Sequence, residues 1–145
     1  MKKLFKLFTL SLVISSLYLV APIANAGVAV ITHPGVKEIG LSKNKLAQIY
    51  LGKIKNYSNG KTIQPVDLPK GNPAQKKFYK SVVQKSDAAV KRYWSKLKFT
   101  GKGKPPKELG SAREVIQWVA NTEGAIGYID GKYLNKSVKV VLILP

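Results

Sequence analysis

The segment Thr100-Gly101-Lys102-Gly103-Lys104 combines glycines, a hydroxyl group and ammonium groups, the residue types that can surround a phosphate group. Its spacing differs from that of the nucleotide-binding loop Gly-x-x-x-x-Gly-Lys-Ser/Thr, because the second glycine and the hydroxyl residue stand elsewhere. Lysine supplies a compact, hydrated positive charge rather than a planar fork of donors. The segment is therefore either a flexible basic rim, in which Thr100, Gly101 and Lys102 contact an anion, or a plain surface loop.

Ser111 is the second candidate, because Ser111-Ala112-Arg113-Glu114 has the spacing of a capping box in front of an apolar run. In such a box the serine side chain accepts a hydrogen bond from an amide of the first helical turn. A bound anion would compete for the same amide groups. The pattern therefore predicts that Ser111 is either a helix cap or an anion ligand.

Catalytic and metal-binding patterns are weak in this chain. The sequence has one histidine, His33, and no cysteine, whereas a metal site needs three or four ligands. Asp67 and Asp130 are acidic residues near strand ends, but neither has a partner at a spacing that suggests acid–base catalysis. No serine has an evident base beside it. We therefore predict no metal site, no cofactor and no enzymatic activity.

The N-terminal residues have the pattern of a secretory signal peptide. Lys2, Lys3 and Lys6 precede an apolar run at residues 7–20, and Ala24-Asn25-Ala26 matches the small-x-small cleavage pattern. Cleavage after this pattern would leave one domain at residues 27–145, and the absence of cysteine excludes a lipoprotein anchor. The expected location is the periplasm. An uncleaved membrane anchor is the alternative interpretation.

The charge of the chain is strongly positive, with 25 basic and 7 acidic residues and a net charge of +18. Without the three lysines of the signal peptide, 22 basic and 7 acidic residues remain, a net charge of +15. Such a field attracts anions without specificity. Lipopolysaccharide, phospholipid headgroups, phosphate and nucleic acid are candidate partners, and a solvated basic surface without a partner is the alternative.

The apolar patterns predict alternating strands and helices. A stripe at Val90, Tyr93, Trp94 and Leu97 has helical spacing and is expected to pack in the core. Pro65 argues that its strand is an edge or is bulged there. The order of the expected strands and helices along the chain implies an α/β domain of two or three layers. The apolar last strand suggests a sheet covered on both faces. The expected strands are residues 28–33, 62–68, 126–129 and 138–144, and the expected helices are residues 42–51, 74–84, 87–97 and 112–120.

The segment Leu46-Ala47-Gln48-Ile49-Tyr50-Leu51-Gly52-Lys53-Ile54, followed by Tyr57-Ser58-Asn59-Gly60, resembles the helix and turn of phosphate ABC transporter substrate-binding proteins. Tyr57 stands where that family usually has tryptophan. Gly124-Ala125-Ile126-Gly127-Tyr128 resembles the strand that closes the same lobe. The resemblance runs over residues 28–144. It implies a single lobe of a type 2 periplasmic-binding-protein fold, with a mixed sheet flanked by helices, and delivery of a solute to an ABC transporter permease.

The resemblance also has a departure at the expected ligand loop. Full-length relatives use an Arg-x-Asp-Gly-Ser-Gly-Thr-like loop that opens a helix, and residues 67–73 stand at this place without the arginine or the hydroxyl groups. A glycine-containing loop before a helix start remains, so the resemblance implies Lys70, Gly71 and Asn72 as anion ligands. Pro73 removes one amide donor. The resemblance covers no second lobe and does not extend to enclosed phosphate binding.

Two functional hypotheses remain open. The first is a periplasmic solute-binding protein that binds phosphate or another small oxyanion for an ABC transporter. The second is an interaction module whose basic face docks on an anionic envelope component or a partner protein. A specific nucleic acid is not expected under either hypothesis.

Overall fold

A mixed five-stranded sheet forms the centre of the computed structural model, which describes residues 27–145; the predicted signal peptide lies outside the described residues. The strand order is β3-β2-β4-β1-β5. β1 is antiparallel to both of its neighbours, β4 and β5, whereas β2 runs parallel to β4 and β3. The fold is α/β, as predicted. The strands are β1 (Val28–Thr32), β2 (Gln64–Asp67), β3 (Lys107–Glu108), β4 (Ala125–Asp130) and β5 (Lys139–Leu144).

The helices begin at the capping residues that the sequence predicts. Ser42, Ser86 and Ser111 each accept a hydrogen bond from an amide of the first turn that follows. The expected helix at residues 74–84 is α2 followed directly by a π-helical turn, η1, which ends at Gln84 with a φ of 55°. The helices are α1 (Lys43–Tyr50), α2 (Pro73–Phe78), η1 (Tyr79–Val83), α3 (Asp87–Phe99), α4 (Ala112–Asn121) and η2 (Gly131–Tyr133).

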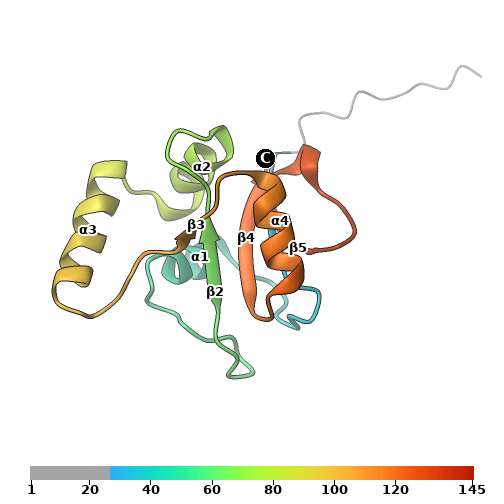
Figure 1. Cartoon of the computed structure of the whole chain (residues 1–145), viewed down its shortest axis with the longest axis horizontal. Helices are drawn as coiled ribbons and strands as arrows, with labels where there is room; N and C mark the ends of the chain where they lie inside the picture. Colours follow the sequence, from blue (N-terminus) through green and yellow to red (C-terminus); the bar gives the residue numbers. More distant parts are fainter. Residues whose placement is uncertain (1–26) are drawn as a thin grey trace, which may run out of the picture.

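Two adjacent residues of β4 show that the sheet lies between two helical layers (Figure 1). A Cβ atom added to Gly127 would lie 2.8 Å from Val115 and 3.3 Å from Val119, both on α4. The ring of Tyr128 stacks on Phe78 of α2 with centroids 4.0 Å apart. Because successive side chains of a strand point to opposite faces, α4 covers one face and α2 the other. The fold is therefore the three-layer alternative.

The sheet is covered on both faces, as predicted, but the last strand is less covered than the centre of the sheet. β5 is an edge strand whose only neighbour in the sheet is β1. Val140, Val141 and Leu142 are partly buried, and the side chain of Ile143 is 49% exposed. In contrast, β4 is buried from Ala125 to Ile129 because α2 and α4 pack against it. The apolar sequence of β5 thus marks an edge that is half covered.

α3 stands apart from the other helices at one end of the molecule (Figure 1). Its single buried residue is Trp94, whose ring lies 3.0 Å from the Cβ position of Gly52. The hydroxyl of Tyr93 donates to the carbonyl oxygen of Leu51 at 2.6 Å. The stripe predicted to pack in the core lies at its margin: Trp94 is buried against the end of α1, and Val90 and Tyr93 pack against the core while staying partly exposed.

Candidate anion-binding cleft

A cleft of about 970 Å³ opens between the start of α2, one side of α4 from its first to its last residue, and the segment that joins β4 to β5. It brings together two of the residues predicted from the sequence, Asn72 and Ser111. Most of the lining is polar and neutral, and Arg113 is its one charged residue. The lining consists of Asn72, Gly110, Ser111, Ala112, Arg113, Ile116, Gln117, Ala120, Asn121, Tyr133, Asn135 and Ser137.

The start of α4 has the predicted capping box. The Ser111 hydroxyl accepts a hydrogen bond from the Glu114 amide at 3.3 Å, and the Glu114 carboxylate accepts one from the Gly110 amide at 2.9 Å. The amides of Ala112 and Arg113 are first-turn donors, which a helix leaves without intrahelical partners. Ser111 is thus a helix cap, and these two amides are the backbone donors that an anion in the cleft could use.

The start of α2 places the loop residues in different environments. The side chain of Asn72 caps α2 by accepting from the Ala74 amide at 2.9 Å. Gly71 has a φ of 94°, a conformation that favours glycine. Lys70 does not line the cleft, because its ammonium group lies 3.6 Å from the carboxylate of Asp87 at the start of α3. Of the three residues implied by the resemblance, the cleft includes Asn72 alone.

Thr100, Gly101 and Lys102 lie at the C-terminal end of α3 rather than at the cleft. The Thr100 hydroxyl donates to the carbonyl oxygen of Lys96 at 2.9 Å, and Gly101 follows with a φ of 68°. The end of a helix presents carbonyl oxygens and the negative end of its dipole, which disfavours an anion. The length of α3, roughly 20 Å at 1.5 Å per residue, separates these residues from Asp87 and its partner Lys70. Thr100 and Lys102 therefore stand apart from the loop at Gly71, so these two sets of predicted residues do not form one anion site.

Arg113 is the cleft residue that the sequence reasoning missed. It is exposed and stands second in α4. The chain contains only two arginines, Arg92 and Arg113, and this rarity is the signal that could have selected it. Tyr133, Asn135 and Ser137 have no local signal, because they reach the cleft only through the connection between β4 and β5.

A partly buried carboxylate fixes the segment that leads into α2. Asp67, the last residue of β2, accepts hydrogen bonds from the hydroxyls of Tyr79 and Tyr128, and from the Leu68 amide at 2.9 Å. Burial raises the pKa of Asp67, although the three donors act in the opposite direction. Burial is also the main cause of the raised pKa of Tyr79 and Tyr128. Both hydroxyls therefore stay protonated and donate, which positions the loop before Asn72.

Residues 27–145 contain no cluster of three or more side chains that could bind a metal ion. The Nδ1 atom of His33 accepts a hydrogen bond from the Gly35 amide at 3.0 Å. Within the same residues, the structure has no helix of the length and apolar character needed to cross a membrane.

Comparison with known proteins gives matches at the level of structure. No protein-family model and no curated protein matches the sequence. A protein from Clostridium perfringens, assigned as a phosphate ABC transporter substrate-binding protein and solved with bound phosphate, has a TM-score of 0.64 at 24% identity. An ABC-type phosphate transport receptor from Vibrio cholerae has a TM-score of 0.62 at 19% identity, and PstS from Borrelia burgdorferi has 0.60 at 17%.

The chain shares the fold of these proteins. Each match covers 79% of this chain and between 44% and 46% of the solved chain, so this chain spans less than half the length of each. These neighbours are transport binding proteins rather than enzymes. Their low identity means that the shared property is the architecture.

Proposed function

We propose that the cleft between α2 and α4 binds phosphate or a similar tetrahedral oxyanion, and that the protein is a solute-binding protein without enzymatic activity. The observation that carries this proposal is the position of Arg113 at the start of α4, within an otherwise neutral and open cleft. A guanidinium group has a planar fork of N–H donors that matches two oxygens of a phosphate group. The neighbours whose names specify phosphate support the choice of ligand.

The start of α4 adds backbone donors to the guanidinium group. The amides of Ala112 and Arg113 form part of the positive end of the helix dipole, which favours an anion. Tyr133 lines the same cleft and its hydroxyl can donate, whereas the Ser137 hydroxyl already donates to the side chain of Asn135. The Glu114 carboxylate already occupies the Gly110 amide and repels a second anion there. The oxyanion therefore binds on the Arg113 side of the helix start.

Two further parts of the proposal concern location and partner. The signal-like pattern supports export, with cleavage after Ala26, no lipoprotein anchor and a periplasmic location for residues 27–145. The fold shared with ABC-type transport receptors supports delivery of the anion to an ABC transporter permease. The net charge of +15 on residues 27–145 raises the local concentration of anions and accelerates their capture.

The test is isothermal titration of residues 27–145 with phosphate, sulfate and chloride at matched ionic strength. We expect saturable 1:1 binding of phosphate, and the variant Arg113→Ala should weaken it roughly tenfold or more, the value of hydrogen bonds to a charged group. Arg92→Ala is the matched control, because it removes the chain's other arginine, which does not line the cleft. A thermal melt at about 100 times the dissociation constant should show a gain of about 2.7 kcal/mol.

Two results would overturn the proposal. An equal response to phosphate, sulfate and chloride would show a general salt effect instead of a receptor site. An equal loss of phosphate affinity in Arg113→Ala and Arg92→Ala would show that overall charge, and not the cleft, attracts the anion.

A further inference from the structure

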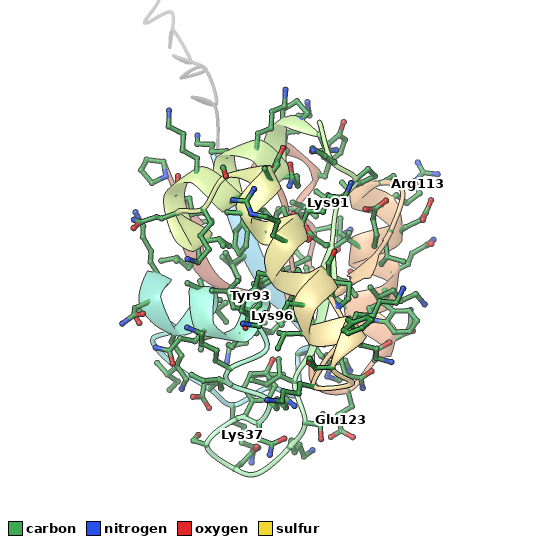
Figure 2. The ribbon with its side chains drawn as sticks, turned by 90° about the vertical axis from the view of Figure 1, so that its left-hand side faces the viewer. Lys37, Lys91, Tyr93, Lys96, Arg113 and Glu123 are labelled. Atoms are coloured by element: carbon green, nitrogen blue, oxygen red, sulfur yellow. The ribbon has the colours of Figure 1, made fainter. Side chains whose placement is uncertain are left out.

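Residues 88–107, from the second residue of α3 to the first residue of β3, form a basic surface without an acidic residue. Between Ala88 and Lys107 the sequence has seven basic residues and no acidic one, and all seven side chains are exposed. Figure 2 looks onto this side of the molecule, where α3 crosses the front and Lys91 and Lys96 lie along it. We call this region the α3 surface; its basic residues are Lys91, Arg92, Lys96, Lys98, Lys102, Lys104 and Lys107.

A fully exposed aromatic side chain stands within this basic surface. Phe99, the last residue of α3, is 92% exposed. Arg92, Lys96 and Phe99 follow one another at i, i+4 and i+7, so they share one face of the helix. Trp94 anchors another face of α3 and is buried. The Phe99 ring therefore points away from the protein, among cations, and takes no part in the core.

We propose that the α3 surface docks the protein on an anionic phospholipid surface, with Phe99 entering the boundary between headgroups and acyl chains. The negative potential of such a surface attracts clustered lysines. An aromatic side chain on a basic helix enters the interface and adds apolar burial. A soluble polyanion without aromatic groups, such as polyphosphate, would need the cations alone and would gain nothing from Phe99. The outward face of α3 has no second aromatic residue to continue a stack of nucleotide bases.

The α3 surface and the anion cleft are separate parts of the molecule. Of the residues that line the cleft, none belongs to α3 or to the turns that follow it up to Lys107. Membrane docking and oxyanion binding can therefore be tested independently. Arg113→Ala should weaken phosphate binding and leave vesicle binding unchanged, so the failure of one proposal is distinguishable from the failure of the other.

The experiment is co-sedimentation with vesicles, either phosphatidylcholine alone or an equimolar mixture with phosphatidylglycerol. Residues 27–145 are used, because they contain all the described strands and the whole described core. Phe99→Ser is compared with Ile39→Ser, a matched control, since Ile39 is 90% exposed in the loop before α1. The double variant Arg92→Glu/Lys96→Glu is compared with Lys37→Glu/Lys43→Glu, which has the same change of charge. Circular dichroism melts verify that every variant is folded.

We expect binding to the anionic vesicles and none to the neutral ones. Phe99→Ser should weaken this binding on the order of tenfold, and Arg92→Glu/Lys96→Glu at least as much, while both control variants stay within about twofold of the wild type. Added salt should weaken binding of the wild type.

Three results would overturn the proposal. The first is an equal effect of Phe99→Ser and Ile39→Ser, and the second is an equal effect of the two double variants, which would show only net charge. The third concerns binding to a single-stranded oligonucleotide and to polyphosphate, measured separately. If Phe99→Ser weakens binding to either of them as much as it weakens binding to vesicles, the surface is not specific for lipid.

Discussion

The hydroxyl of Tyr128, on the central strand β4, donates a hydrogen bond to the partly buried carboxylate of Asp67 at the end of β2. The variant Tyr128→Phe removes this donor, while the ring that stacks on Phe78 remains. We expect a loss of about 1.5–3 kcal/mol in the free energy of unfolding, because a hydrogen bond to a charged group is lost. Urea denaturation at neutral pH measures it.

The pH dependence of this loss is a second readout for Tyr128→Phe. Burial raises the pKa of Asp67 in the folded protein, so the folded state binds the proton more tightly than the unfolded state, and stability rises as the pH falls through the folded pKa. The variant raises that pKa further, and its deficit should shrink on acidification. Tyr93→Phe is the control, since it removes a bond to the neutral Leu51 carbonyl. A deficit that is the same at neutral and acidic pH would contradict the assignment.

Gly127 is a point of close approach between α4 and the sheet. In the variant Gly127→Ala the new methyl group would lie 2.8 Å from Val115 and 2.9 Å from Val66, closer than real contacts allow. Overpacking of this kind costs about 1–3 kcal/mol, which thermal or urea denaturation measures. Gly103→Ala is the matched control, because its methyl group would meet Trp94 at an ordinary 3.6 Å. Equal stability of the two variants would show that α4 can shift away from β4 at little cost.

The ion pair of Glu38 should make the folded protein less stable in acid. Its carboxylate pairs with Lys45 and accepts from the Ser58 amide at 3.1 Å. Lys45 first, and then Ser58, lower the pKa of Glu38 from 4.5 to about 2. Because the folded pKa is below the unfolded value, this stability is present above pH 4.5 and is lost as the pH falls towards 2.

Glu38→Gln should therefore flatten this part of the stability curve, measured as the urea midpoint over a series of acidic pH values. Glu123→Gln is the control, because Glu123 and its partner Lys61 are exposed and water screens their interaction. If Glu38→Gln keeps the full acid slope, another carboxylate is responsible for it.

Substitution of two capping serines distinguishes an effect on stability from an effect on ligand binding. Ser111→Ala and Ser86→Ala each remove an N-cap hydrogen bond, so each should lower the free energy of unfolding by about 1 kcal/mol. Only Ser111 lines the cleft. We therefore expect phosphate titration to give a changed affinity for Ser111→Ala and an unchanged one for Ser86→Ala. Unchanged affinity in both variants would place the anion away from the start of α4.

The helix starts are predictable from the sequence because their causes are local. Ser42, Ser86 and Ser111 each act on amides within the next turn, so neighbouring residues contain the whole signal. Pro65 predicts an edge strand or a bulge, whereas β2 is an inner strand between β3 and β4. β3 pairs with β2 only beyond the proline, at Val66 and Asp67, so Pro65 has a strand neighbour on one side alone.

The cleft is only partly predictable, because its residues come from distant parts of the chain. Asn72 and Ser111 are recognisable as residues at helix starts, but the part played by Arg113 depends on the segment that folds over it. Thr100 and Lys102 show the opposite case. A hydroxyl and an ammonium group can both bind an anion, but the carbonyl groups at the end of α3 disfavour one. The residue types alone do not show which end of a helix they stand at.

The order of the sheet has a consequence for how the chain folds. β1 is the first strand in sequence, but both of its neighbours, β4 and β5, come from the last residues, as Val28 pairs with Asp130 and Leu144. Contacts between such remote residues require closure of a loop almost as long as the domain, which slows folding. The sheet cannot be completed on the ribosome before the final strand has emerged. The sheet therefore stays incomplete until β5 has been synthesised, and a chain with an incomplete sheet can still be threaded through a narrow translocation channel.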